Sequence, residues 1–450
     1  MIFRQIAHED LGCASYLVGD GDAGVAAVVD PRLEIGEYLR LARYLGVSIE
    51  HILETHNHAD HVSGHGRLAA ATGALIHIHE LAEAQYEHEP ISDGWELALG
   101  RVRVRALHTP GHRPEHTAFA LIDTARGDEP WAVLTGDSLF VGDIARPDLA
   151  VEKREGAQGM YGSLRSLLEL GDDVEVWPGH LGGSLCGGPA MDLKVSSTIG
   201  FERRHNELLG ISEADEFVER ATAGLRPQPP NYQAIVGMNR GPLSVSAVEA
   251  HPLTPRQVQQ SDAPVIDVRT AQQFDDAHIP GAICNTILQA GFGTRLAWIA
   301  GPSSEVVLVG RDDADALYAA ELAAAVGVRQ IAGYLAGGMT SWREERLPVA
   351  SIDRVTVDEL RALDVQIVDV RERDEWEAGH IPGSVFAPYH DIRELPAGVD
   401  PSAPVAVICA SGQRAAVGAS LIQRHGAHEV LHVVDGGVPA WERAGYPIVR

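Results

Sequence analysis

The sequence predicts a multidomain α/β protein, and three observations carry that prediction. Its 450 residues exceed one ordinary domain, because about 150 residues per domain gives about three domains. The C-terminal half repeats itself, with Asp267 and Asp369 standing 102 residues apart in matching segments. The N-terminal half contains apolar strand-like segments with helical stretches between some of them. We therefore expect one α/β domain over residues 1–245, followed by two homologous α/β domains with parallel sheets over 246–350 and 351–450.

The strand-like segments of residues 1–245 end in, or run directly into, residues that bind metals. These segments are AAVVD (26–30), HILETH (51–56), RVRVRAL (101–107), WAVLTGD (131–137) and VEVWPGH (174–180). Residues at strand ends lie on loops at one edge of a sheet, where α/β proteins place their sites. The stretch 33–46 has helical periodicity, and the Pro- and Gly-rich stretch 221–243 is predicted to be the seam before the repeats.

A dense histidine cluster begins the candidate site. In THNHADH (55–61), the first two histidines face the same side of an extended segment, and the final Asp-His pair follows round a turn. The candidate ligands are, in chain order, His56, His58, Asp60, His61, His112, Asp137 and His180. Neutral imidazoles and carboxylates gathered in this way are ordinary ligands for zinc, iron or manganese. His65 and His116 are left open between turn residues and supporting partners of the ligands.

This series resembles the metallo-β-lactamase superfamily, whose fold is an αββα sandwich. Many members are hydrolases with two metal ions, and every ligand needed for two ions is present here. The resemblance groups the ligands as His56, His58, His112 and Asp137 with Asp60, His61 and His180. The sequence alone therefore leaves the number of ions open.

The segment TGDSLFVGDIARPDL (135–149) is similar to the persulfide dioxygenases, in which Arg-x-Asp follows the metal-binding aspartate at this distance. Arg146 and Asp148 occupy those positions and are the expected substrate-binding residues. In that family the residues matching His56, His112 and Asp137 hold a single iron. The resemblance thus implies one Fe²⁺ per chain, with Zn²⁺ as the alternative. The remaining candidate ligands become hydrogen-bonding neighbours of the site.

Two residues near this edge have an alternative role each. Arg146 could form a surface ion pair with Asp143 or Asp148 instead of binding substrate. Cys186 follows His180 closely and is either a reactive thiol or a small buried residue.

The two repeats resemble rhodanese domains, a sulfurtransferase fold that carries sulfur on one cysteine. PVIDVRTAQQFDDAHIPGAICN from Pro264 aligns with QIVDVRERDEWEAGHIPGSVFA from Gln366. In the second repeat Cys409 ends an apolar strand, and a short loop leads directly into a helix whose N–H groups stabilise a thiolate. Cys409 is the candidate nucleophile. The loop consists of Ala410, Ser411, Gly412, Gln413 and Arg414. We expect Arg414 to shape the loop or bind the anionic donor.

The first repeat departs from this pattern. Gly310 stands where Cys409 stands in the second repeat, and the following loop contains Asp312, Asp313 and Asp315. A glycine cannot carry sulfur, and three carboxylates destabilise an anion, so residues 246–350 are expected to be catalytically silent. Cys284 lies elsewhere in this repeat and is expected to be structural.

Charge and cysteine usage restrict the partners. A formal charge of −27 disfavours nucleic acid and anionic membranes, which leaves small molecules as the expected partners. The four cysteines form no C-x-x-C pair, which favours a reducing cytoplasm. The first twenty residues lack the continuous apolar core of a signal peptide. We therefore expect a cytoplasmic protein, and a homo-oligomer is left open.

The resemblances imply one combined function. We expect iron-dependent oxidation of a small thiol persulfide, such as glutathione persulfide, by O₂ to sulfite and thiol, coupled to sulfur transfer among thiosulfate, sulfite and a thiol persulfide in sulfide detoxification. A thiol persulfide is the preferred donor to Cys409, because its loop lacks extra basic residues. The alternatives are a di-zinc thioester hydrolase of the hydroxyacylglutathione hydrolase type and a non-enzymatic protein that docks and carries sulfur.

Overall fold

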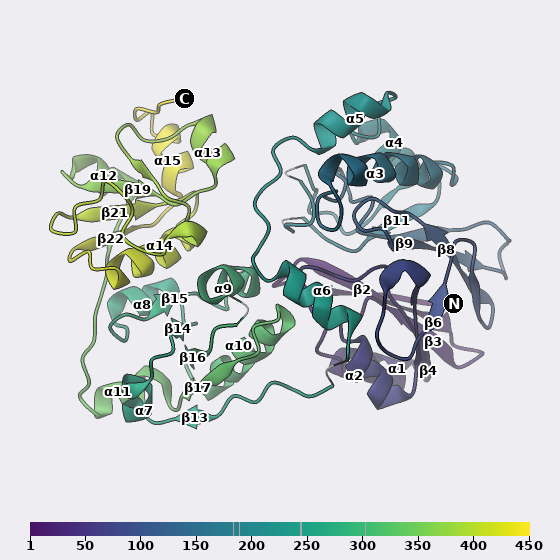
Figure 1. Ribbon diagram of the computed structural model, residues 1–450, viewed down its shortest axis with the longest axis horizontal. Helices are drawn as coiled ribbons and strands as arrows, with labels where there is room; N and C mark the ends of the chain where they lie inside the picture. The colour runs from purple at the N-terminus through teal and green to yellow at the C-terminus, as the bar shows by residue number, and fades with distance from the viewer. Residues whose placement is uncertain (183, 189, 244, 302) are drawn as a thin grey trace. The chain divides into compact units, whose positions relative to one another are not determined.

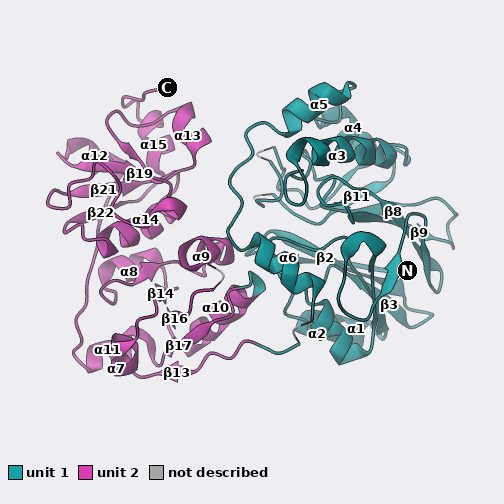
Figure 2. Cartoon of the chain, viewed as in Figure 1, with its two compact units in different colours: residues 1–247, 325–327 teal, residues 248–324, 328–450 magenta. Residues whose placement is uncertain are grey.

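The computed structural model describes residues 1–182, 184–188, 190–243, 245–301 and 303–450 (Figure 1). The chain divides into two compact units, coloured separately in Figure 2. The first comprises residues 1–247 with 325–327, and the second comprises residues 248–324 with 328–450.

The first unit contains two six-stranded sheets that face each other. The first sheet has the order β1 (Ile2–His8), β2 (Cys13–Asp20), β3 (Val25–Val29), β4 (Ser48–Leu53), β5 (Leu75–His79) and β6 (Glu89–Ile91). The second has the order β12 (Ser197–Thr198), β11 (Glu175–Pro178), β10 (Ala132–Gly136), β9 (Thr117–Asp123), β8 (Val102–His108) and β7 (Glu96–Leu99). Apolar side chains from both sheets, among them Tyr16, Leu53, Phe119 and Leu134, form one buried cluster between them. Their burial drives the two sheets together.

Helices cover the outer faces of both sheets and complete an αββα sandwich, as the sequence predicted. α1 (Gly36–Leu45) and α2 (His65–Thr72) pack on the first sheet; α3 (Lys153–Leu168), α4 (Ile199–His205) and α5 (Ala214–Ala221) pack on the second. A short 3₁₀ helix, η1 (Glu80–Ala82), follows β5. The predicted helical stretch 33–46 contains α1, which ends at Gly46 in a left-handed conformation with φ of 70°.

The stretch 221–243, predicted to be the seam before the repeats, contains a packed helix and belongs to the first unit. Residues 232–240 form helix α6 (Tyr232–Arg240), which belongs to the first unit and buries Tyr232, Ile235 and Val236. Proline and glycine at both ends of the segment suggested a linker, but the apolar i, i+3, i+4 spacing inside it is that of a packed helix.

Asn239 on α6 forms hydrogen bonds with the loop of residues 55–63, which follows β4 and is called the histidine loop below. Its side-chain amide donates to the carbonyl oxygens of His58 and His61, both at 2.9 Å, and its Oδ1 accepts from the Ser63 N–H at 2.9 Å. Asn239 is only 2% exposed, so water cannot replace these bonds.

Replacing Asn239 by alanine is expected to destabilise the first unit by about 3 kcal/mol, because it leaves buried backbone groups unpaired. Thermal unfolding and metal content of the variant measure the effect. Gln233→Ala, on the exposed part of the same helix, serves as the control, and equal unfolding temperatures for the two variants would contradict the prediction.

The second unit contains two parallel sheets with the same strand order. One has the order β13 (Pro252–Leu253), β17 (Ile331–Leu335), β16 (Val306–Val309), β14 (Val265–Asp267) and β15 (Ile283–Cys284). The other has the order β18 (Asp353–Val355), β22 (Val430–Val433), β21 (Val405–Ile408), β19 (Gln366–Asp369) and β20 (Val385–Phe386). The helices are α7 (Pro255–Gln260), α8 (Ala271–Asp276), α9 (Phe292–Ala300), α10 (Asp313–Ala325) and α11 (Gly338–Glu344), then α12 (Val357–Ala362), α13 (Arg373–Ala378), α14 (Gln413–Arg424) and α15 (Gly437–Arg443), with the 3₁₀ helix η2 (Tyr389–Asp391).

Each repeat contains the sequence Asp-Val-Arg, at 267–269 and at 369–371, and this DVR motif makes the same contacts in both repeats. Arg269 forks onto Asp267 and donates to the carbonyl of Ala277 at 2.8 Å, and Arg371 forks onto Asp369 and donates to the carbonyl of Gly379 at 2.8 Å. All four side chains are buried, so each fork ties the end of a central strand to the end of the next helix.

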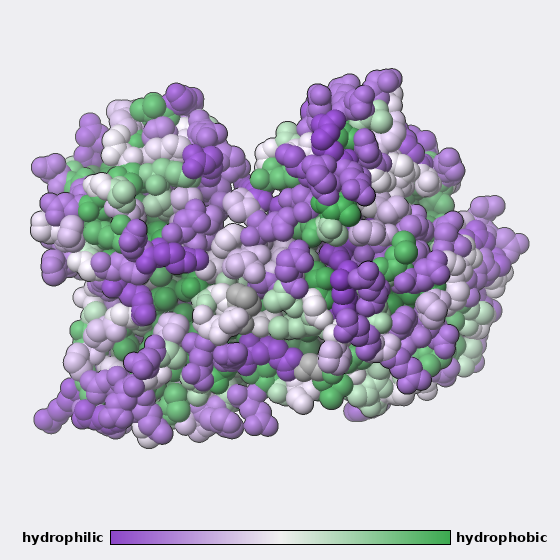
Figure 3. Space-filling model, viewed as in Figure 1, coloured by the Kyte–Doolittle hydropathy of each residue, from purple (hydrophilic) through white to green (hydrophobic). Residues whose placement is uncertain are grey.

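No helix in the described parts of the chain is long and apolar enough to cross a membrane. On the face shown in Figure 3, hydrophilic residues cover much of both units and hydrophobic residues are scattered among them.

Candidate functional site

Three side chains from separate loops bring their donor atoms together at one edge of the sandwich. His56 follows β4, His112 lies between β8 and β9, and Asp137 directly follows β10. Their donor atoms lie within 4.8 Å of one another, and His112 Nε2 is 3.5 Å from Asp137 Oδ2. Each side chain is at most 1% exposed. His56 Nε2, His112 Nε2 and both Asp137 oxygens have no hydrogen-bond partner among the described residues. Buried polar atoms that converge without partners fit a metal ion.

The other ring nitrogen of each histidine is held in place. The Thr55 hydroxyl donates to Asp30 Oδ2 at 2.8 Å and therefore accepts from His56 Nδ1, 2.9 Å away. His112 Nδ1 donates to the backbone carbonyl of Arg146 at 2.9 Å. Because each Nδ1 carries the proton, each Nε2 keeps its lone pair for a metal.

The charges of these three groups suit a cation. Burial, with the neighbouring His58 and His112, lowers the pKa of His56 well below its ordinary value, and burial also lowers the pKa of His112. Burial opposes ionisation of Asp137, but His180 and His112 hold the pKa of this carboxyl below its ordinary value. Two neutral imidazoles and one carboxylate result, which is the donor set of non-haem iron sites.

The other candidate ligands are paired with carboxylates. His61 Nδ1 donates to Asp60 Oδ1 at 3.1 Å, and His180 Nε2 lies 3.4 Å from Asp60 Oδ2 and 3.3 Å from Asp137 Oδ2. Burial opposes the charge on His180, but the carboxylates of Asp137 and Asp60 raise its pKa to about 10. His58 Nε2 lies 3.3 Å from Asp30 and 3.4 Å from Glu54, whose carboxylates outweigh burial and raise the pKa of His58.

His116, left open by the sequence, supports the loop that carries Asp137. Its Nε2 accepts from the Asp137 backbone N–H at 2.8 Å, so its Nδ1 carries the proton and donates to the Thr109 hydroxyl at 2.8 Å. Gly136 makes this approach possible: its φ is +48°, and a Cβ there would lie 2.7 Å from His116 Nε2. His65 instead packs away from the three donors and bonds Glu54 Oε1 at 3.1 Å.

Arg146 has a backbone role and a side-chain role. Its carbonyl orients His112, as described above, while its guanidinium forks onto Asp148 at 2.7 and 2.8 Å. It also donates to the carbonyl of Arg226 at 2.7 Å. The pair with Asp148 that the sequence offered as an alternative is thus formed, but it is buried, since Arg146 is 5% exposed. Cys186 is 1% exposed, and its Sγ belongs to a close donor group with Asp60 and His180.

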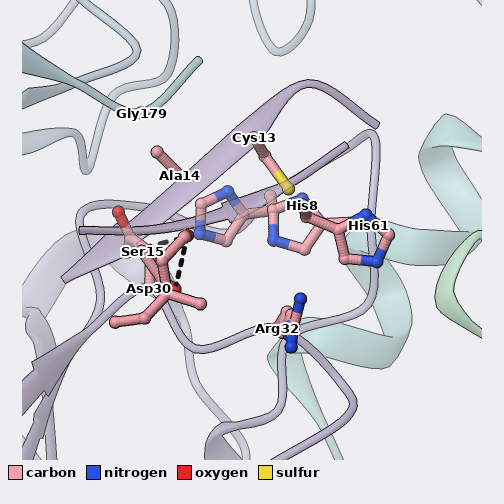
Figure 4. A pocket seen from close by; sticks show the side chains of 10 residues that line it. His8, Cys13, Ala14, Ser15, Asp30, Arg32, His61 and Gly179 are labelled. Carbon is pink, nitrogen blue, oxygen red and sulfur yellow. Dashed lines mark hydrogen bonds and ion pairs between the residues drawn. The ribbon is translucent and has the colours of Figure 1, made fainter. Parts of the chain in front are cut away.

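Two cavities are lined by candidate ligands or by their neighbours: His58 and His61 line one, and Arg113, next to His112, lines the other. A small one of about 10 Å³ is lined by residues that include His8, Cys13, Asp30, Arg32 and His61, which Figure 4 shows around it. It has room for about one water molecule. A larger one of about 380 Å³ is lined by residues flanking the ligands and by α6, among them Arg113, Glu115, Leu149, Val236 and Arg240. Its size is that of small-ligand pockets.

The predicted sulfur-carrier loop connects β21 to α14. Cys409 Sγ accepts from the N–H groups of Gly412 at 3.1 Å and Ser411 at 3.4 Å. Gly412 caps α14 with a φ of +95°, a conformation that favours glycine. Arg414 is turned onto Glu375, with bonds of 2.5 and 2.8 Å, so in this structure it shapes the loop. Gln413 donates to the carbonyl of Ala290 at 3.2 Å.

The corresponding loop of the first repeat is built differently. At Gly310 a Cβ would lie 2.5 Å from the carbonyl oxygen of Asp312 and 2.8 Å from the Ala316 nitrogen. Asp315 forms an ion pair with Arg311 at 2.5 Å, and Asp313 Oδ1 accepts from the Gly337 N–H at 2.8 Å. Two of the three carboxylates of this loop therefore bond other groups of the same domain, and Gly310 places no thiol beside them.

The chain is similar to known proteins over most of its length. The metallo-beta-lactamase superfamily profile matches residues 8–180, and the rhodanese-like domain profile matches residues 254–345 and 356–444. The mitochondrial persulfide dioxygenase ETHE1 of Homo sapiens is 30% identical over 223 residues, which are 49% of this chain and 80% of that protein. The hydroxyacylglutathione hydrolase of Rhodospirillum rubrum is 34% identical over 171 residues, 37% of this chain and 60% of that hydrolase, so the chain spans under two thirds of its length.

The similarity to a solved structure extends over most of the chain. A metallo-beta-lactamase from Staphylococcus aureus is 27% identical, with a TM-score of 0.68, and the match covers 75% of this chain and 98% of that one.

Proposed function

Because the chain belongs to the metallo-beta-lactamase superfamily, as a homologue of the persulfide dioxygenases with two rhodanese-like domains attached, we propose that it oxidises a small thiol persulfide with O₂ at one iron and transfers sulfur on Cys409. The first reaction balances as RSSH + O₂ + H₂O → RSH + sulfite + 2 H⁺. The observation that carries the proposal is the group of buried potential metal ligands His56, His112 and Asp137. The Nε2 atoms of the two histidines and the carboxylate oxygens of Asp137 have no hydrogen-bond partner among the described residues.

The three donors suit this reaction for a geometric reason. When bound, Fe(II) held by two imidazoles and one carboxylate supplies open positions for substrate and O₂ side by side. The protein contributes the orientation: Thr55 fixes His56, the Arg146 carbonyl fixes His112, and the His116 ring fixes the backbone of Asp137. Donor atoms of His58, Asp60 and His61 also lie within 4.8 Å of one another, so a second ion is the alternative that metal analysis tests.

We assign the thiol part of the substrate to the cavity of about 380 Å³, which is lined by residues next to the ligands. Its lining carries two ion pairs, Arg113 with Glu115 at 2.6 Å and Arg240 with Glu83 at 3.1 Å, so polar groups of both signs face a bound thiol. All four cysteines are free, which suits a reducing compartment such as the cytoplasm.

The deciding experiment measures O₂ consumption by iron-loaded protein supplied with glutathione persulfide, with metal analysis on the same sample. Persulfide-dependent uptake with about one iron per chain is the expected result. No uptake with two zinc ions per chain would overturn the proposal.

Arg146→Ala is expected to raise the Michaelis constant for glutathione persulfide while bound iron stays unchanged. The bond to His112 comes from the backbone carbonyl, which alanine retains, whereas the guanidinium that positions Asp148 is lost. Steady-state kinetics and iron analysis test this, with Arg126→Ala as an exposed control. Loss of iron from Arg146→Ala alone would make the side chain structural.

For the second reaction we propose that Cys409 takes the outer sulfur of a thiol persulfide or thiosulfate and passes it to a thiol or sulfite. The sulfur leaves its donor as the new Cys409 persulfide forms, and the Gly412 and Ser411 N–H groups stabilise the anion. The product of the iron site, sulfite, is an acceptor for this site.

A thioester hydrolase with two zinc ions remains the second candidate function. The identity of 34% to a hydroxyacylglutathione hydrolase favours it, and so does the complete set of seven superfamily ligands. Hydrolysis of S-lactoylglutathione by the zinc-loaded protein, together with the metal count, separates the two candidates.

A further inference from the structure

We propose that a buried His432–Asp275 pair, formed jointly by the two rhodanese-like domains, positions the loop that holds the Cys409 sulfur. The cysteine-less domain would then be a working part of the sulfur-carrier site. The inference rests on the proposed sulfur transfer by Cys409, and it gives a role to a domain that cannot itself carry sulfur.

The geometry of the pair determines where its protons lie. His432 belongs to β22 of the second domain and Asp275 to α8 of the first, and each is 2% exposed. His432 Nε2 lies 2.8 Å from the carbonyl oxygen of Gly412, and Nδ1 lies 2.8 Å from Asp275 Oδ2. A carbonyl oxygen can only accept, so Nε2 must carry a proton. A second proton lies between Nδ1 and the carboxylate, and this bond fixes the ring.

The Gly412 carbonyl is one of the points that hold the loop, besides the bonds of Arg414 and Gln413 described above. It accepts from the Ala416 N–H at 2.9 Å, as part of the first turn of α14, and from His432. The N–H of the same residue donates to Cys409 Sγ at 3.1 Å. At the other end of the loop, the Cys409 carbonyl accepts from the Val438 N–H at 2.9 Å. Of these two carbonyl anchors, one thus lies within the second domain, and the other depends on Asp275 of the first.

Further hydrogen bonds join α14 to the cysteine-less domain. The Ser420 hydroxyl accepts from the Cys284 N–H at 3.0 Å, and Gln413 donates to the Ala290 carbonyl. Gln423 Oε1 lies 2.8 Å from His278 Nε2, and Arg424 donates to the Gly281 carbonyl at 2.5 Å. The first domain therefore contacts the first turn, the middle and the end of the helix that begins at the sulfur-carrier loop.

The residues that match His432 and Asp275 in the opposite repeats cannot form the same pair beside Gly310. In the aligned repeats Gly333 of the first domain matches His432, and Glu377 of the second domain matches Asp275. Glu377 is 66% exposed and approaches Arg373 on its own helix. The repeats share the buried forks of Arg269 and Arg371 but differ in this connection, as expected if it belongs to sulfur transfer and not to folding.

The first test compares Asp275→Asn with Asp276→Asn. The neighbouring Asp276 is exposed and pairs with Arg354, so both changes remove one charge from the same helix. The amide in Asp275→Asn replaces an ionic hydrogen bond by a weaker neutral one, and we expect kcat for sulfur transfer from thiosulfate to cyanide to fall about fivefold with KM unchanged. Asp276→Asn should match the wild type. Equal rates for the two variants would overturn the proposal.

The second test keeps or removes the hydrogen-bond donor to Gly412 in a background without the buried charge. Asp275→Asn is combined with His432→Gln or with His432→Met, whose side chains have equal length. Only Gln can donate to the Gly412 carbonyl. We expect the Gln double variant to transfer sulfur about tenfold faster than the Met double variant at similar thermal stability. If both are equally slow, His432 acts through packing alone and the proposal is wrong.

Amide hydrogen exchange of the peptide 405–416 provides a readout that needs no sulfur transfer. We expect faster exchange in Asp275→Asn than in Asp276→Asn, because the loop loses part of one anchor. If the wild-type protein takes up no sulfur on Cys409, the proposed function fails, whereas unchanged exchange in Asp275→Asn defeats the positioning role alone.

Discussion

Replacing Asp137 by alanine is expected to remove the bound metal and to lower persulfide-dependent O₂ uptake by at least about a hundredfold. Asp137 supplies the carboxylate of the three-donor group, and both its oxygens lack hydrogen-bond partners among the described residues. Without it, two neutral imidazoles remain, which cannot balance the charge of a divalent ion in a buried site. Metal analysis after gel filtration, and O₂ uptake with glutathione persulfide, measure both effects.

Asp60→Ala is the matched control, because Asp60 is a carboxylate of the same edge that bonds His61 and lies beside His180. Under the one-iron proposal this variant still holds about one iron per chain and remains active. If Asp60→Ala loses metal as completely as Asp137→Ala does, Asp60 is itself a metal ligand. That result would favour the thioester hydrolase with two zinc ions over the dioxygenase with one iron.

Replacing Cys409 by serine is expected to lower sulfur transfer by at least about a thousandfold and to leave O₂ uptake with pre-made glutathione persulfide intact. A serine hydroxyl in the same loop remains protonated and cannot accept sulfur, whereas the N–H groups of Gly412 and Ser411 stabilise a thiolate. Transfer from thiosulfate to cyanide measures the loss. Mass spectrometry of the wild-type peptide containing Cys409 should show the added sulfur atom.

Cys284→Ala is the control for Cys409→Ser, because Cys284 is also buried but lies in the repeat without the carrier loop. It should retain sulfur transfer. Loss of both O₂ uptake and sulfur transfer in Cys409→Ser would defeat the two-site proposal, since the two reactions would then depend on one residue.

The sequence was sufficient for the sandwich, the repeated parallel sheets and the edge on which the candidate ligands gather. Apolar strands ending in His or Asp are local signals, so the loops after β4 and β10 could be located without coordinates. The repeat was visible because the DVR motif has a fixed structural task, the buried fork of Arg269 and of Arg371.

What the sequence could not supply were partners distant along the chain. Asn239 holds the backbone of the histidine loop from 178 residues away, and the proline-rich flanks of its helix concealed it. The Arg146 carbonyl that orients His112 has no side-chain signature at all. Between neighbours the sequence fails for another reason: the pairing of Asp60 with His61 depends on rotamers and burial, which residue spacing does not encode.

The crowding around Gly310 also limits what evolution or engineering can do with the first rhodanese-like domain. Introducing cysteine there would place its Cβ 2.5 Å from one backbone oxygen and 2.8 Å from a backbone nitrogen, so the surrounding turn would have to be rebuilt first. A nucleophile therefore cannot be gained at this position by any single substitution.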